Sequence, residues 1–189
     1  MSAILLTAPA VEPLSLGEAK AFLRVEHADD DQLIAALIAA ARLHVERQTQ
    51  VALITQTWRM AFDRWPAHGR IAARPAPLKA LAGARVYDSE GNAHAIDTQA
   101  FVMDIGASML AFVPWAMPVP TRIAVGIEID ITAGFGDTAA DVPEPLRQAI
   151  RLLVAHWYEN RGLVAAGSQS TALPVTVAAL VAPYRMLPL

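Results

Sequence analysis

Cysteine is absent from the 189-residue sequence, and lysine occurs only at Lys20 and Lys79. The lack of cysteine excludes disulfides, thiolate metal sites and cysteine nucleophiles. The arginines are scattered without a run, and the formal net charge is −3. Because tight binding to duplex DNA requires clustered cationic side chains, we do not expect a DNA-binding module.

Long hydrophobic runs are missing too. The longest, Leu33 to Ala41, is about half as long as the roughly 18 apolar residues of a transmembrane helix, so no membrane partner is expected. The start of the chain lacks basic residues, and Ile4 to Leu6 is too short for the hydrophobic part of a signal peptide, which predicts a cytosolic product. Apolar residues still make up 54% of the chain, which favours apolar surface reserved for partners.

Two helices are predicted near the N-terminus. Ser15 and Glu18 have the spacing of a capping box, in which each side chain satisfies the other residue's backbone amide, and a helix over residues 16–24 follows. The three acids at 29–31 favour the positive end of a second helix dipole. Apolar residues keep helical spacing from there to about Gln48, which predicts a long second helix.

The middle of the chain changes to the two-residue period of β-strands, beginning with Trp58, Met60 and Phe62. Two hairpins are predicted next, over residues 84–96 and 101–113. The clearest strand is predicted over Arg122 to Thr132, with one core face and one solvated face. The expected core residues are Ile123, Val125, Ile127, Ile129 and Ile131, and the expected solvated residues include Glu128 and Asp130.

The C-terminal third returns to helix. Pro143 suits the first turn of a third helix, and Gly162 suits its C-terminal cap. Residues 167–171 are rich in glycine and serine and predict a flexible link. A short helix is predicted over residues 175–181, followed by an apolar tail over residues 183–189.

This order of elements predicts an α+β fold. It consists of an N-terminal helix pair, central antiparallel strands, a long C-terminal helix and an extended apolar tail. We expect residues 1–162 to form one domain that contains the helices and strands. Residues 163–189 are expected to form the link, the short helix and a C-terminal docking tail.

Few residues have the pattern of catalytic chemistry. Gly134 to Ala139 matches a glycine-rich phosphate loop, but the next helix begins only near Pro143, so a strand-ending turn is the preferred interpretation. None of the five histidines has metal-ligand spacing. Glu128 and Asp130 share a strand face and Asp137 lies just beyond, which leaves a metal-assisted hydrolase as the alternative from another class. The preferred prediction is a protein that is not an enzyme, with no catalytic, cofactor-binding or metal-binding residue.

Two loops and the tail are the candidate contact sites. Trp65 and Trp115 lie next to prolines in predicted loops, where an exposed tryptophan is a candidate anchor for a partner. The tail is apolar, yet its prolines prevent a regular helix and it is too short to form its own core, so we expect it to dock on a partner. Its candidate docking residues are Leu180, Val181, Tyr184, Arg185, Met186, Leu187 and Leu189.

Short segments of caps, core stripes and turns follow one another in a distinctive order. They are residues 14–20, 22–25, 29–34, 55–58, 131–136, 142–150, 155–161 and 182–185. In this order and spacing they resemble the head–tail connector (adaptor) proteins of tailed phages, prophages and gene transfer agents. The resemblance extends from about Leu14 to Arg185, although residues 64–120 match only in pattern. None of the segments is catalytic.

The resemblance implies a structural subunit of a ring, with about twelve identical copies placed below the portal in the neck of a particle. Its C-terminal segment would attach to the portal protein, and a stopper or tail-side neck protein would bind the other face. DNA would pass through the ring without specific binding, which suits the mildly acidic charge. The protein would be made in the host cytoplasm and end in the neck of the virion or phage-like particle. The alternative within this class is a stopper or tail-completion protein of the same neck.

Overall fold

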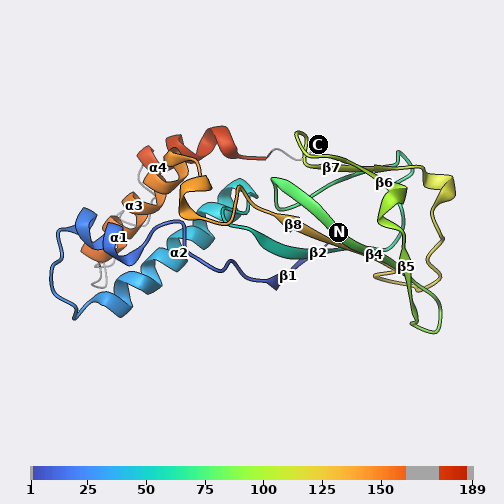
Figure 1. The fold of residues 1–189 in the computed structure, drawn as a ribbon, viewed down its shortest axis with the longest axis horizontal. Coiled ribbons are helices and arrows are strands. Elements are labelled where there is room, and N and C mark those ends of the chain that lie inside the picture. Colours follow the sequence, from blue (N-terminus) through green and yellow to red (C-terminus); the bar gives the residue numbers. More distant parts are fainter. Residues whose placement is uncertain (1, 161–174, 187–189) are drawn as a thin grey trace, which may run out of the picture. The chain divides into compact units, whose positions relative to one another are not determined.

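A computed structural model describes residues 2–160 and 175–186 (Figure 1). The chain divides into two compact units, one of residues 1–9 and 55–135, the other of residues 10–54 and 136–189. The first unit contains the strands and the second contains the α-helices, which confirms the predicted α+β class. None of the helices in the described part of the chain is long and apolar enough to cross a membrane.

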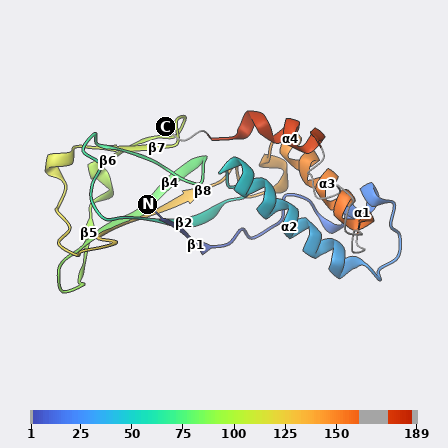
Figure 2. The same ribbon diagram turned by 180° about the vertical axis from the view of Figure 1, so that it is seen from behind.

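Two antiparallel sheets build the first unit. The larger has five strands in the order β1-β2-β8-β4-β5, and the smaller has three in the order β3-β7-β6 (Figure 2). The larger sheet consists of β1 (Ser2–Thr7), β2 (Gln56–Phe62), β8 (Ile127–Ala133), β4 (Leu78–Tyr87) and β5 (Ala93–Ile96). The smaller consists of β3 (Arg70–Ala72), β7 (Met109–Phe112) and β6 (Phe101–Asp104). Both predicted hairpins are therefore confirmed, as β4–β5 and β6–β7.

The core of this unit lies on one face of the five-stranded sheet. Met60 of β2 and Ile129 of β8 lie opposite each other in register, and both are fully buried. Leu110 of β7 is fully buried as well. The hydroxyl of Ser108 accepts a hydrogen bond of 3.1 Å from the backbone amide of Leu78, which ties the turn before β7 to the start of β4. The two-residue period of β2 and β8 thus delivers alternate side chains to a single core.

The strand predicted from Arg122 starts only at Ile127. Val125 has a left-handed backbone with φ 53°, and a Cβ atom at Gly126 would come within 2.6 Å of a proline side chain. The chain therefore turns sharply before β8, because a left-handed residue cannot continue a strand. Ile123 is consequently 100% exposed instead of contributing to the core.

The described residues of the second unit form four α-helices: α1 (Leu16–Leu23), α2 (Asp31–Thr49), α3 (Glu144–Glu159) and α4 (Val175–Val181). All four lie where the sequence predicts them. α2 packs against α3, and α3 packs against α4. Their buried stripes include Ile34, Ile38, Leu146, Ile150 and Leu153. The predicted cap at Gly162 and the predicted link at 167–171 lie outside the described residues.

Short 3₁₀ helices occur in both units. They are η1 (Thr98–Ala100), η2 (Pro114–Ala116), η3 (Ala139–Asp141) and η4 (Ala182–Tyr184). The first three join longer elements, and η4 continues directly from the end of α4. The prolines at the start of η2 and within η4 have the fixed φ angle that suits the first turn of a helix.

The acids before α2 act on neighbouring helices as well as on the helix start. Asp31 accepts a hydrogen bond of 2.6 Å from Lys20 of α1. Asp30 is the N-cap of α2 but makes no side-chain capping bond, and its carboxylate instead accepts from the hydroxyl of Tyr158 on α3. The local helix-start signal in the sequence thus also carries two contacts between helices.

The predicted capping box is present at the start of α1. The Ser15 hydroxyl accepts from the Glu18 amide at 3.2 Å, and the Glu18 carboxylate accepts from the Ser15 amide at 3.0 Å. The pKa of Glu18 is lowered, chiefly by this bond from the Ser15 amide. The box therefore satisfies two amides that the helix itself leaves without partners.

Replacing Ser15 with alanine is expected to lower the free energy of unfolding by about 1 kcal/mol, because one capped amide loses its acceptor. Urea unfolding followed by circular dichroism measures the change. Ser89→Ala, at an exposed position in the β4–β5 turn, is the control and is expected to have little effect. An equal loss in both variants would show that the box does not stabilise α1.

Candidate functional site

Four charged side chains meet on the face of the five-stranded sheet opposite its core. The register places Arg59 opposite Asp130 and Arg85 opposite Glu128. Arg59 donates two hydrogen bonds to Asp130, from Nε to Oδ1 at 2.7 Å and from Nη2 to Oδ2 at 2.9 Å. Arg85 also donates to Asp130, and the Tyr87 hydroxyl donates to Glu128 at 2.8 Å. We call Arg59, Arg85, Glu128 and Asp130 the arginine–carboxylate cluster.

The cluster shifts the pKa values of Asp130 and Arg59 in favour of their charged forms. The hydrogen bond from Arg59 lowers the pKa of Asp130 below its usual 3.8, and the nearby Arg85 guanidinium acts in the same direction. The bond to Asp130 raises the pKa of Arg59. Burial, followed by the bond to Glu128, raises the pKa of Tyr87. The cluster therefore stays fully paired at neutral pH.

The prediction that Glu128 and Asp130 lie on a solvated face is wrong, because each side chain is only 13% exposed and is paired with arginine. The alternative of a metal-assisted hydrolase loses its basis for the same reason. Guanidinium groups take up the carboxylate oxygens that a metal ion would need, and Asp137 belongs to the other unit. Within residues 2–160 and 175–186, no group of three or more His, Asp or Glu side chains is arranged to hold a metal ion.

The glycine-rich segment after β8 is a turn held by side chains. Thr138 donates to the Asp141 carboxylate through its amide at 2.9 Å and its hydroxyl at 2.8 Å. The same carboxylate lies against Gly136, where a Cβ atom would come within 2.4 Å of it. Glycine is therefore required by the close approach of Asp141, which confirms the interpretation of this segment as a turn.

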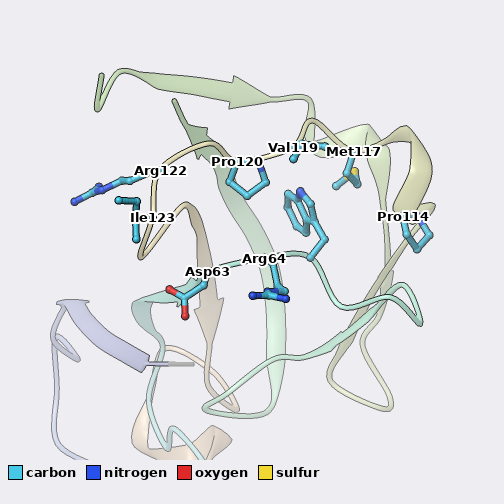
Figure 3. A pocket seen from close by; sticks show the side chains of 9 residues that line it. Asp63, Arg64, Pro114, Met117, Val119, Pro120, Arg122 and Ile123 are labelled. Carbon is cyan, nitrogen blue, oxygen red and sulfur yellow. The ribbon is translucent and has the colours of Figure 1, made fainter. Parts of the chain in front are cut away.

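Trp65 is half-buried in an aromatic cluster. Its ring centroid lies 5.0 Å from that of Phe112 and 6.1 Å from that of Phe101, and its indole donates a 2.8 Å hydrogen bond to the Pro118 carbonyl. It also forms one wall of an open pocket of about 450 Å³ (Figure 3). The other lining residues are Asp63, Arg64, Pro114, Met117, Val119, Pro120, Arg122 and Ile123. Trp65 thus shapes the pocket, and only part of its ring is available to a partner.

Trp115 differs, because it is 88% exposed on η2. Val119 and Ile123 in the same stretch of chain are 79% and 100% exposed, and both line the pocket. Exposed large apolar side chains are candidate contact residues for a partner. Trp115 therefore keeps its predicted role as a candidate anchor for a partner.

The start of the predicted tail is bound to its own unit. Val181, at the end of α4, is buried. Arg185 donates to the Gln48 side chain at 3.1 Å, and the Met186 amide donates to the Thr49 carbonyl at 3.0 Å. Among the other predicted docking residues, Leu180 and Tyr184 are half-buried, and Leu187 and Leu189 lie outside the described residues.

Comparison with known proteins gives matches among solved structures alone. No protein-family model matches the sequence, and no curated protein matches it. The chain is similar over 100% of its length to a chain in the neck of an empty gene transfer agent (GTA) particle computed with C6 symmetry, with a TM-score of 0.83 and 27% identity. It is similar to a chain in the virion of the native GTA particle, with a TM-score of 0.83 and 26% identity.

The neck of the native GTA particle, computed with C12 symmetry, contains a similar chain with a TM-score of 0.75 and 28% identity. In all three comparisons the match covers 97% of the other chain. The chain is therefore a full-length structural match to neck components of GTA particles.

Proposed function

We propose that this chain is a non-enzymatic structural subunit of the neck of a GTA or related phage-like particle. The observation that carries the proposal is the similarity to a GTA neck chain over the whole length, with a TM-score of 0.83. The similarity includes both compact units, so it reaches beyond a single shared domain. The exposed apolar side chains around Trp115 suit a protein whose surfaces are covered on assembly.

Within the neck, we propose that the chain is the head–tail adaptor, in a ring of about twelve copies below the portal. Supporting this, the segments that resemble the adaptor family form helix starts and turns here: the capping box of α1, the acids before α2, and the Pro143 start of α3. The C-terminal segment would bind the portal, and a stopper or tail-side protein would bind the opposite face. The protein would assemble in the host cytoplasm and remain in the neck.

DNA would pass through this ring without being held. The formal net charge is −3, and the arginines of the arginine–carboxylate cluster are already paired with carboxylates. Phosphate binding requires cations that are free to replace counterions. Such a surface suits a conduit through which a charged polymer slides.

The test mixes the purified protein with the portal protein from the same gene cluster and measures a joint complex by sedimentation. Three chains are compared: full length, a chain ending at Met186, and a chain ending at Ala182. The chain ending at Met186 keeps the hydrogen bonds of Arg185 to Gln48 and of the Met186 amide to the Thr49 carbonyl. We expect the full-length chain to bind, and both shorter chains to lose affinity by about tenfold or more, because each lacks Leu187 and Leu189.

The outcomes separate the tail prediction from the adaptor proposal. Equal binding by all three chains would support the adaptor proposal and refute the prediction that the tail docks on the portal. Loss of portal affinity only in the chain ending at Ala182 would indicate that the docking residues lie within 183–186. Full-length protein that binds a tail-side neck protein but never the portal would identify a stopper instead.

A further inference from the structure

β1 is an edge strand of the five-stranded sheet. It stands at one end of the strand order, and all six of its residues, Ser-Ala-Ile-Leu-Leu-Thr, are exposed. Ile4, Leu5 and Leu6 are 54%, 39% and 44% exposed. Neighbouring residues of a strand point to opposite faces, so apolar side chains stand on both sides of this edge. Soluble proteins usually protect such edges with lysine, proline, inward charge or a β-bulge. The register of β1 shifts between Leu5 and Thr7, but the strand contains no lysine, proline or charged residue.

β5 is the other edge of the same sheet. Its four residues, Ala93–Ile96, contain no Lys, Arg, Asp or Glu, and the first three are exposed. The imidazole of His94 is held at 2.9 Å by Asp88 in the preceding turn. The outer edge of β5 therefore presents backbone amides and carbonyls beside two alanines, Ala93 and Ala95, where a further strand can approach closely.

We propose that β1 of one copy pairs with β5 of the next copy, so that the five-stranded sheets join around the ring. This inference rests on the proposed function, because it needs a closed assembly of identical subunits. A ring requires two different, complementary patches on each subunit, and the two edges of one sheet meet that requirement. Closure would also leave no edge of this sheet exposed, as in a barrel.

The occupant of the β1 edge is thus a second copy of this chain. Pairing of β1 with β1 would be isologous and would stop at pairs of subunits, whereas pairing of β1 with β5 continues from copy to copy. The apolar side chains of β1 would lie beside Ala93 and Ala95, whose small size leaves room for them. Burial of Ile4 and Leu5 would stabilise the pairing in addition to the backbone hydrogen bonds between the two strands.

Engineered disulfides test the pairing without background, because the chain has no cysteine. Within one copy, β1 and β5 are separated by three strands, which places them roughly 19 Å apart at the usual strand spacing. A disulfide needs Cα atoms within about 7 Å, so any bond between the two edges must join two copies. Variants combining Ile4→Cys or Leu5→Cys with Ala93→Cys or Ala95→Cys cover adjacent registers.

Each full-length variant is assembled with the portal protein, treated with oxidised glutathione and run on a non-reducing gel. At least one double variant is expected to give a ladder of trimers and larger species. Each single variant, and the pair Leu5→Cys with Ala67→Cys in an exposed loop, should remain monomeric on the gel. A ladder from the edge pairs alone supports the pairing of β1 with β5.

Three results would overturn the inference in distinguishable ways. Rings that form with the portal but give no ladder in any double variant refute the edge pairing and leave the proposed function intact. Dimers from the single variants at β1 indicate pairing of β1 with itself. Failure of the cysteine-free protein to form any assembly, alone or with the portal, refutes the proposed function and the edge pairing together.

Discussion

Replacing Ile129 with alanine is expected to lower the free energy of unfolding by about 3 kcal/mol. Ile129 is fully buried in β8, between Met60 of β2 and Ala84 of β4 in register. Truncation removes the transfer free energy of the lost methyl groups and leaves a cavity that neighbouring strands cannot fill. Urea unfolding followed by tryptophan fluorescence measures the loss.

Ile123→Ala is the matched control, because the alternating sequence pattern places both isoleucines on one core face. Ile123 is 100% exposed in the structure, so its truncation is expected to change the free energy of unfolding by less than about 0.5 kcal/mol. Similar losses in the two variants would indicate that Ile123 is buried in the core, and would contradict the sharp turn at Val125.

Replacing Asp130 with alanine is expected to cost about 3 kcal/mol at neutral pH, because it leaves Arg59 and Arg85 on a half-buried face with Glu128 alone. Asp29→Ala is the control, since that side chain is 92% exposed beside His27. Its removal is expected to change stability by less than about 1 kcal/mol. The same urea titration measures both variants, and equal small effects would contradict a stabilising role for the cluster.

The difference between wild type and Asp130→Ala should also depend on pH. The pKa of Asp130 is lower in the folded chain than its usual 3.8, so the folded state holds this proton less tightly than the unfolded state. Its contribution is therefore fully present above pH 3.8 and is lost as pH falls through the folded-state pKa. We expect the wild-type advantage to shrink in acid, and an advantage that grew in acid would contradict the cluster geometry.

The helices could be predicted from the sequence because their signals are local. The Ser15 and Glu18 box, the acids at 29–31 and Pro143 each lie next to the helix they start. The two hairpins are local for the same reason, since each joins neighbouring strands through a short turn. Local chemistry thus specifies these elements without contacts that are distant in sequence.

The remaining features depend on partners distant in sequence. β1 is short, and its only paired strand, β2, begins at Gln56, so nothing near β1 indicates a sheet. Asp130 is paired with Arg59, 71 positions earlier, and without that register its carboxylate is expected to face water. The alternation that includes Ile123 continues into a residue with a left-handed backbone, which a two-residue period cannot reveal.

Function could be predicted to the level of the neck, because the segments that resemble the adaptor family are caps and turns that the structure contains. The full-length similarity to GTA neck chains is an independent observation that supports the same assignment to the neck. The contact residues could not be derived in this way. Trp65 and Trp115 both lie beside prolines in loops, yet one is a half-buried wall of a pocket and the other is 88% exposed.

Native mass spectrometry of the complex formed with the portal protein is the direct test of the proposed adaptor ring, because it counts the copies of this chain in the complex. We expect a discrete complex that contains a closed ring of about twelve copies bound to the portal. A chain that stays monomeric at every concentration and forms no complex with the portal or with a tail-side neck protein would contradict it.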